Sequence, residues 1–341
     1  MDKQQTKNKH FTYEERIKIE TFIGIGYGKR KIGRLINRPK SSICDEIKIN
    51  SVKGIYTAKK AQLKAYQRRW RAKYQVLKIA INSKLQDFVE DKIHRYWSPE
   101  GISGRIKFVE TNYDYVGKDA IYSYVKSVHG RNLEKFLWYK GKKWKSKHYS
   151  KVTQLKDRMF IDQRPKYVDK RRFFGDWEAD FIVSGRKGKG ALLVFVERKS
   201  RYVLIFKLED RKVATINYIL HTLIGANLIA NSLTIDNDIC FRHHKEMSEI
   251  MKAPIYFCHP YHSWEKGAVE KMNQLIRRFI SKGTNISKVS EKKILWVQNI
   301  LNGRPYECLG FYTPEEIAKS NLKLKIFVNK IKTTPVAALC R

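Results

Sequence analysis

Apolar and polar positions near the amino terminus follow the period of short helices. Thr12 followed by Glu15 forms a capping-box sequence, which predicts a helix beginning near Tyr13. Gly28 interrupts this pattern, a second short helix ends near Pro39, and the run "KSSICDEIKIN" predicts a third. Three such helices favour a helix-turn-helix, and a generic three-helix bundle with a solvated face is the alternative.

A similar pattern recurs over residues 61–137. The basic run "AKKAQLKAYQRRWRAKY" precedes Ser98, an N-cap residue with Pro99 at the first helical position, and the run "GKDAIYSYVKSVHG" closes at Gly130. This order predicts a basic helix and a second helix-turn-helix in tandem with the first.

From residue 173 the pattern changes to that of strands. Three antiparallel strands are predicted by the runs "WEADFIVSG", "ALLVFVERK" and "RYVLIFKL". After them come a helix over 212–231, a strand "SLTI", a helix over 244–251, a strand "PIYFC" and a helix over 263–279. A strand meander followed by alternating helices and strands predicts an α/β fold in which helices cover a mixed sheet.

Length and composition place few limits on function. The chain has 341 residues, of which 42% are hydrophobic, enough for at least one substantial core. No run of about 18 apolar residues occurs, and the opening "MDKQQTKNKHF" lacks the apolar region of a secretory signal, so a cytoplasmic protein without membrane contact is expected. The five cysteines form no CxxC pair, which argues against a disulfide framework and a cysteine-based zinc site.

The formal net charge of +37 lies mostly in the first half of the chain. Residues 1–172 carry 43 basic and 17 acidic side chains, against 27 and 16 in residues 173–341. This excess favours a nucleic-acid partner, because each neutralised phosphate releases condensed counterions, although ribosomal or membrane-surface binding would also explain charge alone. Residues 138–172 mix basic and aromatic side chains without periodicity, which predicts a linker that tracks a phosphate backbone.

Candidate DNA contacts follow from the two helical units. In a helix-turn-helix the last helix enters the major groove and its polar side chains meet phosphates and base edges. The candidates in the first unit are Lys40, Ser41, Ser42 and Lys48, and those in the second unit are Lys118, Tyr122 and Lys126. Tyr122 would also fit a core position.

Three acids, Asp176, Glu178 and Asp180, alternate in the run "GDWEADFIV" and therefore share one face of the first strand. Asp236 falls at the carboxyl end of the fourth strand and Glu270 lies in the helix after the fifth, where open α/β sheets place ligands. Carboxylates that converge there need a cation between them, and Mg²⁺ suits oxygen ligands. The pattern alone does not choose among the three strand acids.

Four segments resemble the successive blocks of the IS-thirty family of bacterial insertion-sequence transposases. They read "RPKYVDKRRFFGDWEADFIVSG", "LTIDND", "YFCHPYHSWEKGAVEKMNQLIRRFISKGT" and "LNGRPYECLGFYTPEEI", and the likeness covers the amino-terminal helix-turn-helix and nearly all of 160–318. The resemblance implies a ribonuclease-H-like catalytic domain with a DDE triad, two Mg²⁺ ions for which Mn²⁺ can substitute, and recognition of terminal inverted repeats by the amino-terminal region. Its triad falls on Asp180, Asp236 and Glu270. Asp176 and Glu178 are then neighbours that support the site or pair with Arg171 and Arg172.

The same resemblance implies a reaction and its partners. Water would cleave double-stranded DNA at the element's ends, the freed 3′-hydroxyl would join to target DNA, and a dimer or larger homo-oligomer would hold two ends together. The protein is accordingly expected in the cytoplasm, on the nucleoid. Phosphate-positioning groups are expected at Lys266, Asn273 and Arg277.

Three positions depart from the family pattern. The family commonly follows its second Asp with Asn-Gly and then, two residues later, Glu, whereas this chain has Asp238 for the Gly and Cys240 for the Glu. Val269, beside Glu270, replaces an Asn. The alternative function is therefore a catalytically degenerate DNA-binding repressor of its own element.

Two histidine pairs, His259 with His262 and His243 with His244, lack cysteines at ligand spacing, which favours phosphate contacts or surface histidines over zinc. The predicted order is a helix-turn-helix over 1–60, a basic helix and second helix-turn-helix over 61–137, a basic linker over 138–172, the catalytic domain over 173–325 and a tail over 326–341. The fold class is thus an α/β ribonuclease-H-like mixed sheet flanked by helices, preceded by an all-helical DNA-binding region.

Overall fold

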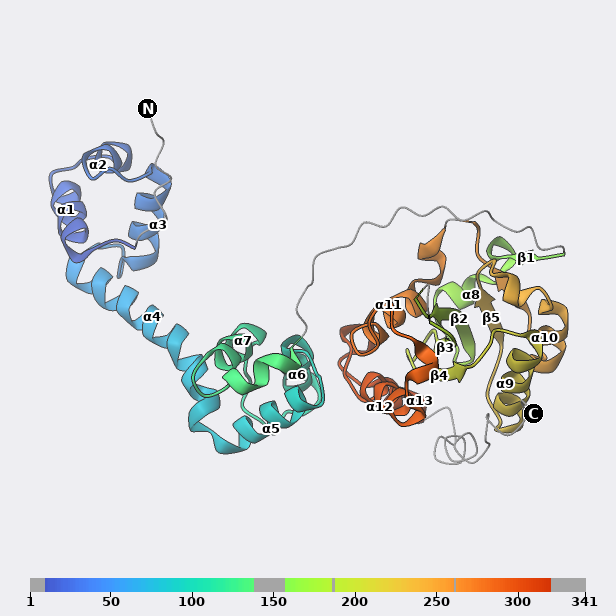
Figure 1. The fold of residues 1–341 in the computed structure, drawn as a ribbon. Helices are drawn as coiled ribbons and strands as arrows, with labels where there is room; N and C mark the ends of the chain where they lie inside the picture. Colours follow the sequence, from blue (N-terminus) through green and yellow to red (C-terminus); the bar gives the residue numbers. More distant parts are fainter. Residues whose placement is uncertain (1–9, 138–156, 186–187, 261, 320–341) are drawn as a thin grey trace.

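The computed structural model describes residues 10–137, 157–185, 188–260 and 262–319. Two helical units are followed by a domain built on one mixed sheet (Figure 1). The basic and aromatic positions of 138–156 and the tail lie outside the described residues. Within the described ranges, no helix combines the length and the apolar character needed to cross a lipid bilayer.

The first helical unit contains α1 (Tyr13–Gly24), α2 (Lys29–Leu35) and α3 (Lys40–Asn50). The predicted capping box is confirmed, because the Thr12 hydroxyl accepts from the Glu15 amide while the Glu15 carboxylate accepts from the Thr12 amide. Gly33 lets α2 approach the following turn, since a Cβ there would lie 2.7 Å from the Arg38 carbonyl oxygen. The core of this unit is formed by Ile19, Ile32, Ile43, Tyr56 and Ala61.

A single long helix, α4 (Ala58–Ile81), belongs to both helical units (Figure 1). Its start contributes Ala61 to the first core, and its end contributes Ile79 to the second. The second unit continues with α5 (Ser83–His94), α6 (Pro99–Phe108), α7 (Lys118–Lys126) and η1 (Arg131–Phe136). Ser98 caps α6 and Pro99 starts it, as predicted, whereas α7 ends before the predicted boundary at Gly130.

The sheet has the strand order β1-β6-β5-β2-β3-β4. The three predicted antiparallel strands are confirmed as β2 (Asp176–Val183), β3 (Ala191–Glu197) and β4 (Val203–Leu208). β5 (Ser232–Ile235) pairs in parallel with β2, and β6 (Ile255–Phe257) pairs in parallel with β5. β1 (Met159–Phe160) adds a parallel edge beside β6, from within the stretch predicted as linker.

Helices cover both faces of this sheet (Figure 1), and they meet it through two apolar cores. One core joins the sheet to α9 (Val213–Gly225) and α10 (His244–Met251), and the other joins it to α11 (Gly267–Ile276) and α12 (Glu291–Asn302). Trp177 and Ala179 of β2 enter the first core, while Ile182 enters the second, as strand alternation requires. The predicted α/β fold, a mixed sheet flanked by helices, is thus confirmed.

Short elements complete the domain. They are η2 (Ile161–Gln163), α8 (Lys166–Asp169), η3 (Ile239–Phe241), η4 (Ser263–Lys266), η5 (Ile286–Lys288), η6 (Glu307–Leu309) and α13 (Pro314–Lys319). The predicted helix over 263–279 is therefore a 3-10 turn followed by α11, because the backbone of Lys266 (φ −118°, ψ 43°) departs from helical values.

The second helical unit docks on the segment after α12. The Trp97 indole donates to the Gly303 carbonyl at 2.9 Å, and the Arg105 guanidinium makes a two-pronged ion pair with Glu316, both contacts being 2.7 Å. The Phe311 ring lies directly over α6, where a Cβ on Gly104 would come within 2.1 Å of it. Glycine is therefore the residue that this contact requires.

We expect Gly104→Ala to displace the Phe311 ring and loosen this docking. Alanine favours a helix by about 1 kcal/mol, but the overlap should outweigh that gain and leave a net loss of about 1–2 kcal/mol in the free energy of unfolding. Urea titration measures the loss, and limited proteolysis reports the exposure of 303–316. Gly225→Ala is the control, because Gly225 also lies in a helix, α9, and its Cβ would meet nothing within 4 Å. Equal behaviour of the two variants would contradict the expectation.

Candidate active site

The three acids of β2 have three different environments. Asp176 is fully buried and accepts a 2.6 Å hydrogen bond from the Ser232 hydroxyl. Glu178 is also buried, and its partner is the guanidinium of Arg198, not Arg171 or Arg172. Asp180 is 19% exposed and lies nearest the end of the strand. It is therefore the member of this group that a ligand in solution can reach most directly.

Asp180 and Asp236 meet at the side chain of Lys266. β2 and β5 are parallel neighbours, so the carboxyl end of β5 brings Asp236 beside the middle of β2. The Lys266 ammonium lies 3.0 Å from an Asp180 oxygen and 2.8 Å from an Asp236 oxygen. These two carboxylates thus already face one cationic group, at a position that is largely buried.

Burial governs the electrostatics of this cluster. It raises the pKa of the Asp180 carboxyl, an effect that the Lys266 ammonium opposes and the nearby Asp236 reinforces. Burial also disfavours the charged form of Lys266, but the two carboxylates outweigh it and raise the pKa of the ammonium. The pair of acids is thus arranged to hold a positive charge.

Helix α11 carries the third expected acid and contacts β2 at two acidic side chains. Glu270 lies in the first turn of α11, and Asn273, one turn later, donates through its side-chain amide to the second Asp180 oxygen at 2.8 Å. The Glu178 carboxylate accepts the Val269 amide at 2.9 Å, which anchors the start of α11 to β2. The apolar face of α11 lies in the second core through Val269, Met272 and Ile276.

The donor set suits a hard divalent cation. Carboxylate oxygens are the ligands that Mg²⁺ prefers, and Asp180 and Asp236 already share one positive charge between them. Lys266, expected from the sequence to position a phosphate, lies between those acids. Arg277, expected to do the same, donates instead to the Val183 carbonyl at 2.9 Å and to Ser281, so it ties α11 to the end of β2.

The extra acid at Asp238 has its own partners, Arg211 and the start of η3. One Asp238 oxygen pairs with Arg211 at 2.9 Å, and the other accepts the Cys240 amide at 2.9 Å, which caps η3. Cys240 is partly buried against the α9–α10 core, and burial together with Asp238 raises the pKa of its thiol to about 12. These two departures from the family pattern are therefore accommodated by local contacts.

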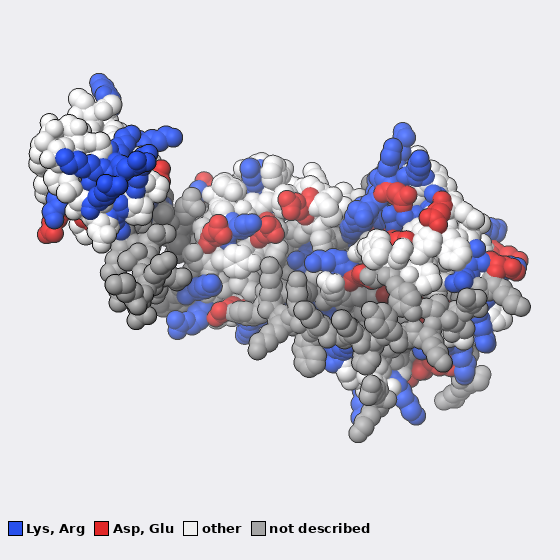
Figure 2. Space-filling model, turned by 90° about the horizontal axis from the view of Figure 1, so that it is seen from above, with Lys and Arg blue, Asp and Glu red and all other residues white. Residues whose placement is uncertain are grey.

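The DNA-contact candidates of the helical units lie apart from this cluster. Lys40, Ser41 and Lys48 are exposed on α3, and Ser42 is half-buried. Figure 2 shows basic side chains gathered on this unit, and the exposed ones on α2 and α3 are Lys29, Arg30, Lys31, Arg34, Lys40 and Lys48.

On α7 of the second unit, Tyr122 and Lys126 are exposed, so Tyr122 is not the core residue of this helix; Tyr124 is. Lys118 is also exposed, and its ammonium pairs with Glu100 at 3.0 Å. The negative charge of Glu100 weakens the attraction between Lys118 and a DNA phosphate.

Comparison with known proteins places the chain among enzymes of mobile DNA. It is 33% identical over 317 residues to the transposase for insertion sequence element IS4351 of Bacteroides fragilis, covering 91% of this chain and 95% of that protein. It is 28% identical over 328 residues to the transposase InsI for element IS30C of Escherichia coli, covering 92% and 85%. The catalytic core domain of BIV integrase matches 44% of this chain and 97% of its own, with 20% identity and a TM-score of 0.35. No protein-family model matches.

Proposed function

Because the chain belongs to the insertion-sequence transposases, as its resemblance to the IS-thirty family predicts, we propose that it cleaves DNA at the ends of its own element and joins those ends to target DNA. The catalytic groups of this proposal are Asp180, Asp236 and Glu270. One observation carries it: Asp180 and Asp236, from two parallel strands, converge on a single cationic group beside the helix that carries Glu270.

Asp180, Asp236 and Glu270 would hold two Mg²⁺ ions. When bound, such ions stabilise the charge that develops on the attacking and leaving oxygens of an in-line phosphoryl transfer. In the first reaction water attacks the phosphorus at the element's end, the bond to the 3′-oxygen breaks, and a free 3′-hydroxyl results. In the second, that hydroxyl attacks a phosphorus of the target, forming one phosphodiester and breaking another.

The neighbouring side chains prepare this site. Asn273 holds one Asp180 oxygen in place, and the other oxygen faces the Lys266 ammonium. Glu178 fixes the first turn of α11 and therefore the position from which Glu270 projects. Lys266 reduces the electrostatic repulsion between the two acids. Its long flexible side chain allows the ammonium to move from the acids to a DNA phosphate.

The decisive experiment incubates the full chain with a duplex that contains the element's terminal repeat, in Mg²⁺ and in Mn²⁺. We expect cleavage at the repeat end that depends on the ion, and joining of the product to a second duplex. A protein that binds the repeat but cuts nothing in either ion would instead support the repressor. The Asp238 contacts favour the enzyme, since its carboxylate is already engaged by Arg211.

We propose that α3 binds the terminal repeat, as the last helix of a helix-turn-helix does. We expect Lys48→Ala to weaken binding of the full chain and to reduce the slope of log affinity against log salt by about 1, because one phosphate contact is lost. Electrophoretic mobility shifts at several salt concentrations measure both. Lys292→Ala, which removes an exposed lysine from α12, is the control and should change neither. Equal affinity of the unmodified chain for the repeat and for scrambled DNA would refute specific recognition.

A further inference from the structure

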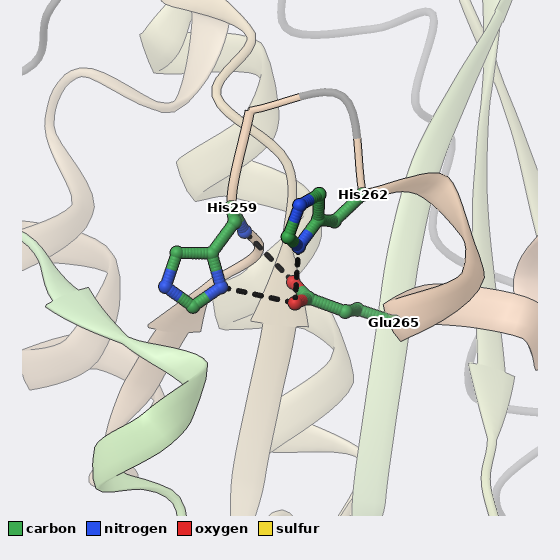
Figure 3. Close-up of side chains that lie close together, drawn as sticks. All are labelled: His259, His262 and Glu265. Carbon is green, nitrogen blue, oxygen red and sulfur yellow. Dashed lines mark hydrogen bonds and ion pairs between the residues drawn. The ribbon is translucent and has the colours of Figure 1, made fainter.

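Three side chains converge between β6 and α11, outside the carboxylate cluster. His259 follows β6, and η4 turns the chain back so that Glu265 faces both His259 and His262 (Figure 3). The Nδ1 atoms of the two histidines lie 2.9 and 3.1 Å from the same Glu265 oxygen. The other Glu265 oxygen accepts the His259 amide at 2.8 Å. The three side-chain ligand atoms all lie within 4.8 Å of one another.

The two nitrogen–oxygen distances are close to those of a tetrahedral metal site. Zinc bonds of 2.0–2.1 Å to nitrogen or oxygen separate tetrahedral ligands by about 3.3–3.4 Å, so the distances of 2.9 and 3.1 Å from Glu265 to the two imidazoles need to open by only a few tenths of an ångström, and the third separation lies within 4.8 Å. Two imidazoles and one carboxylate form a donor set that zinc uses with a fourth, open position. Nitrogen donors also distinguish this site from the all-oxygen cluster of Asp180 and Asp236, which suits Mg²⁺.

Both imidazole rings also contact residues outside the three-residue group. The Nε2 of His259 lies 2.8 Å from an Asp162 oxygen, so a proton on Nε2 leaves the Nδ1 lone pair directed at the shared point. A carboxylate on the far nitrogen is the usual support of a metal-binding histidine, because it sets the tautomer and the ring orientation. His262 stacks on Trp264 with centroids 4.4 Å apart, and His259 stacks on Phe160 at 5.3 Å.

The side chains are accessible enough for an ion to enter. Their exposed fractions are 30% for His259, 44% for His262 and 14% for Glu265. The pattern HPYH alone suggested phosphate contacts or surface histidines, because no cysteine lies at ligand spacing. The third donor is Glu265, which becomes visible as a ligand only when the turn of η4 brings it back.

We propose that His259, His262 and Glu265 form a zinc site that stiffens the connection between β6 and α11. Lys266 follows Glu265 directly, and Glu270 lies one turn further along the chain. A metal bond at Glu265 therefore fixes the segment from which Lys266 reaches the two catalytic acids. Through Asp162, the same site ties the η2 segment to this loop.

The test measures zinc on the full chain after dialysis against a chelator and return of Zn²⁺. We expect one tightly held zinc ion per chain, lost in His262→Ala and in His259→Gln and retained in His243→Ala. His243 is the matched control, because it pairs with a single glutamate at 3.6 Å and lies outside the three-residue group. Replacement of Zn²⁺ by Co²⁺ should give the strong visible absorption of a tetrahedral nitrogen and oxygen site, absent in His262→Ala.

Asp236→Asn separates this site from the proposed catalytic one. It should keep the zinc ion and the cobalt spectrum while losing DNA cleavage. Retention of zinc by both histidine variants, its loss in Asp236→Asn, or the lack of tight zinc on the unmodified chain would each overturn the proposal. His262 is substantially exposed, so its removal leaves no buried gap, and circular dichroism establishes that each variant is folded.

Discussion

Asp180→Asn, Asp236→Asn and Glu270→Gln should each reduce Mg²⁺-dependent cleavage of a terminal-repeat duplex by well over 100-fold. Loss of a residue that only supports a metal ligand costs about 10–100-fold, so loss of a ligand itself should cost more. Each substitution keeps the size of the side chain and removes one negative charge. Single-turnover cleavage assays with excess protein measure the effect separately from the affinity for DNA, which should change little.

Asp176→Asn is the matched control for Asp180→Asn. Both acids belong to β2 and share its face, but Asp176 is fully buried and bound to the Ser232 hydroxyl, away from Lys266. We therefore expect the Asp176 variant to retain most of its cleavage rate. If Asp176→Asn abolished cleavage while Asp180→Asn did not, the first ligand would be wrongly assigned.

Glu178→Gln should lower the free energy of unfolding by about 3–5 kcal/mol, because it leaves the buried Arg198 charge without its main partner. The side chains of Glu178 and Arg198 are only 1% and 6% exposed, so water cannot replace the lost carboxylate. Burial lowers the pKa of the Arg198 guanidinium, and the charge of Glu178 opposes that shift. Urea denaturation followed by circular dichroism gives the difference.

The control for Glu178→Gln is Glu315→Gln. Glu315 pairs with Lys319 at 3.2 Å on the surface, where both side chains are about half exposed, and such pairs contribute less than about 0.5 kcal/mol. Glutamine retains an oxygen that can accept the Val269 amide, so α11 should stay anchored in the Glu178 variant. A loss no greater than that of the control would mean that Arg198 finds another partner, such as Asp169 at 3.8 Å.

Local patterns in the sequence predict many of the helices and strands of the fold. The capping box at Thr12, the proline at the start of α6 and the period-two strands each depend on residues close together in the chain, and all three are confirmed. β1 was not predicted, because two residues are too short for a periodic signal and its pairing with β6 is made across nearly a hundred positions.

The candidate site was predicted less completely. Alternation placed three acids on one face of β2, but the choice of Asp180 came from the family resemblance. What distinguishes the three acids in the structure is tertiary, since Arg198 pairs with Glu178 and the Ser232 hydroxyl on a neighbouring strand binds Asp176. The sequence indicates Lys266 as a basic residue near the site, yet its position between two acids depends on the break between η4 and α11, which no periodicity reveals.

Because α4 contributes to both helical cores, its length sets the distance between the two helical units. Its 24 residues correspond to about 36 Å of helix, close to one turn of B-form DNA. Two units that grip one duplex from this spacing would therefore meet the same side of it in successive grooves. Nuclease protection of a terminal repeat would then show two protected segments on the same side of the duplex. Insertion of half a helical turn of DNA between those segments would place the second segment on the side opposite to the helical unit that binds it.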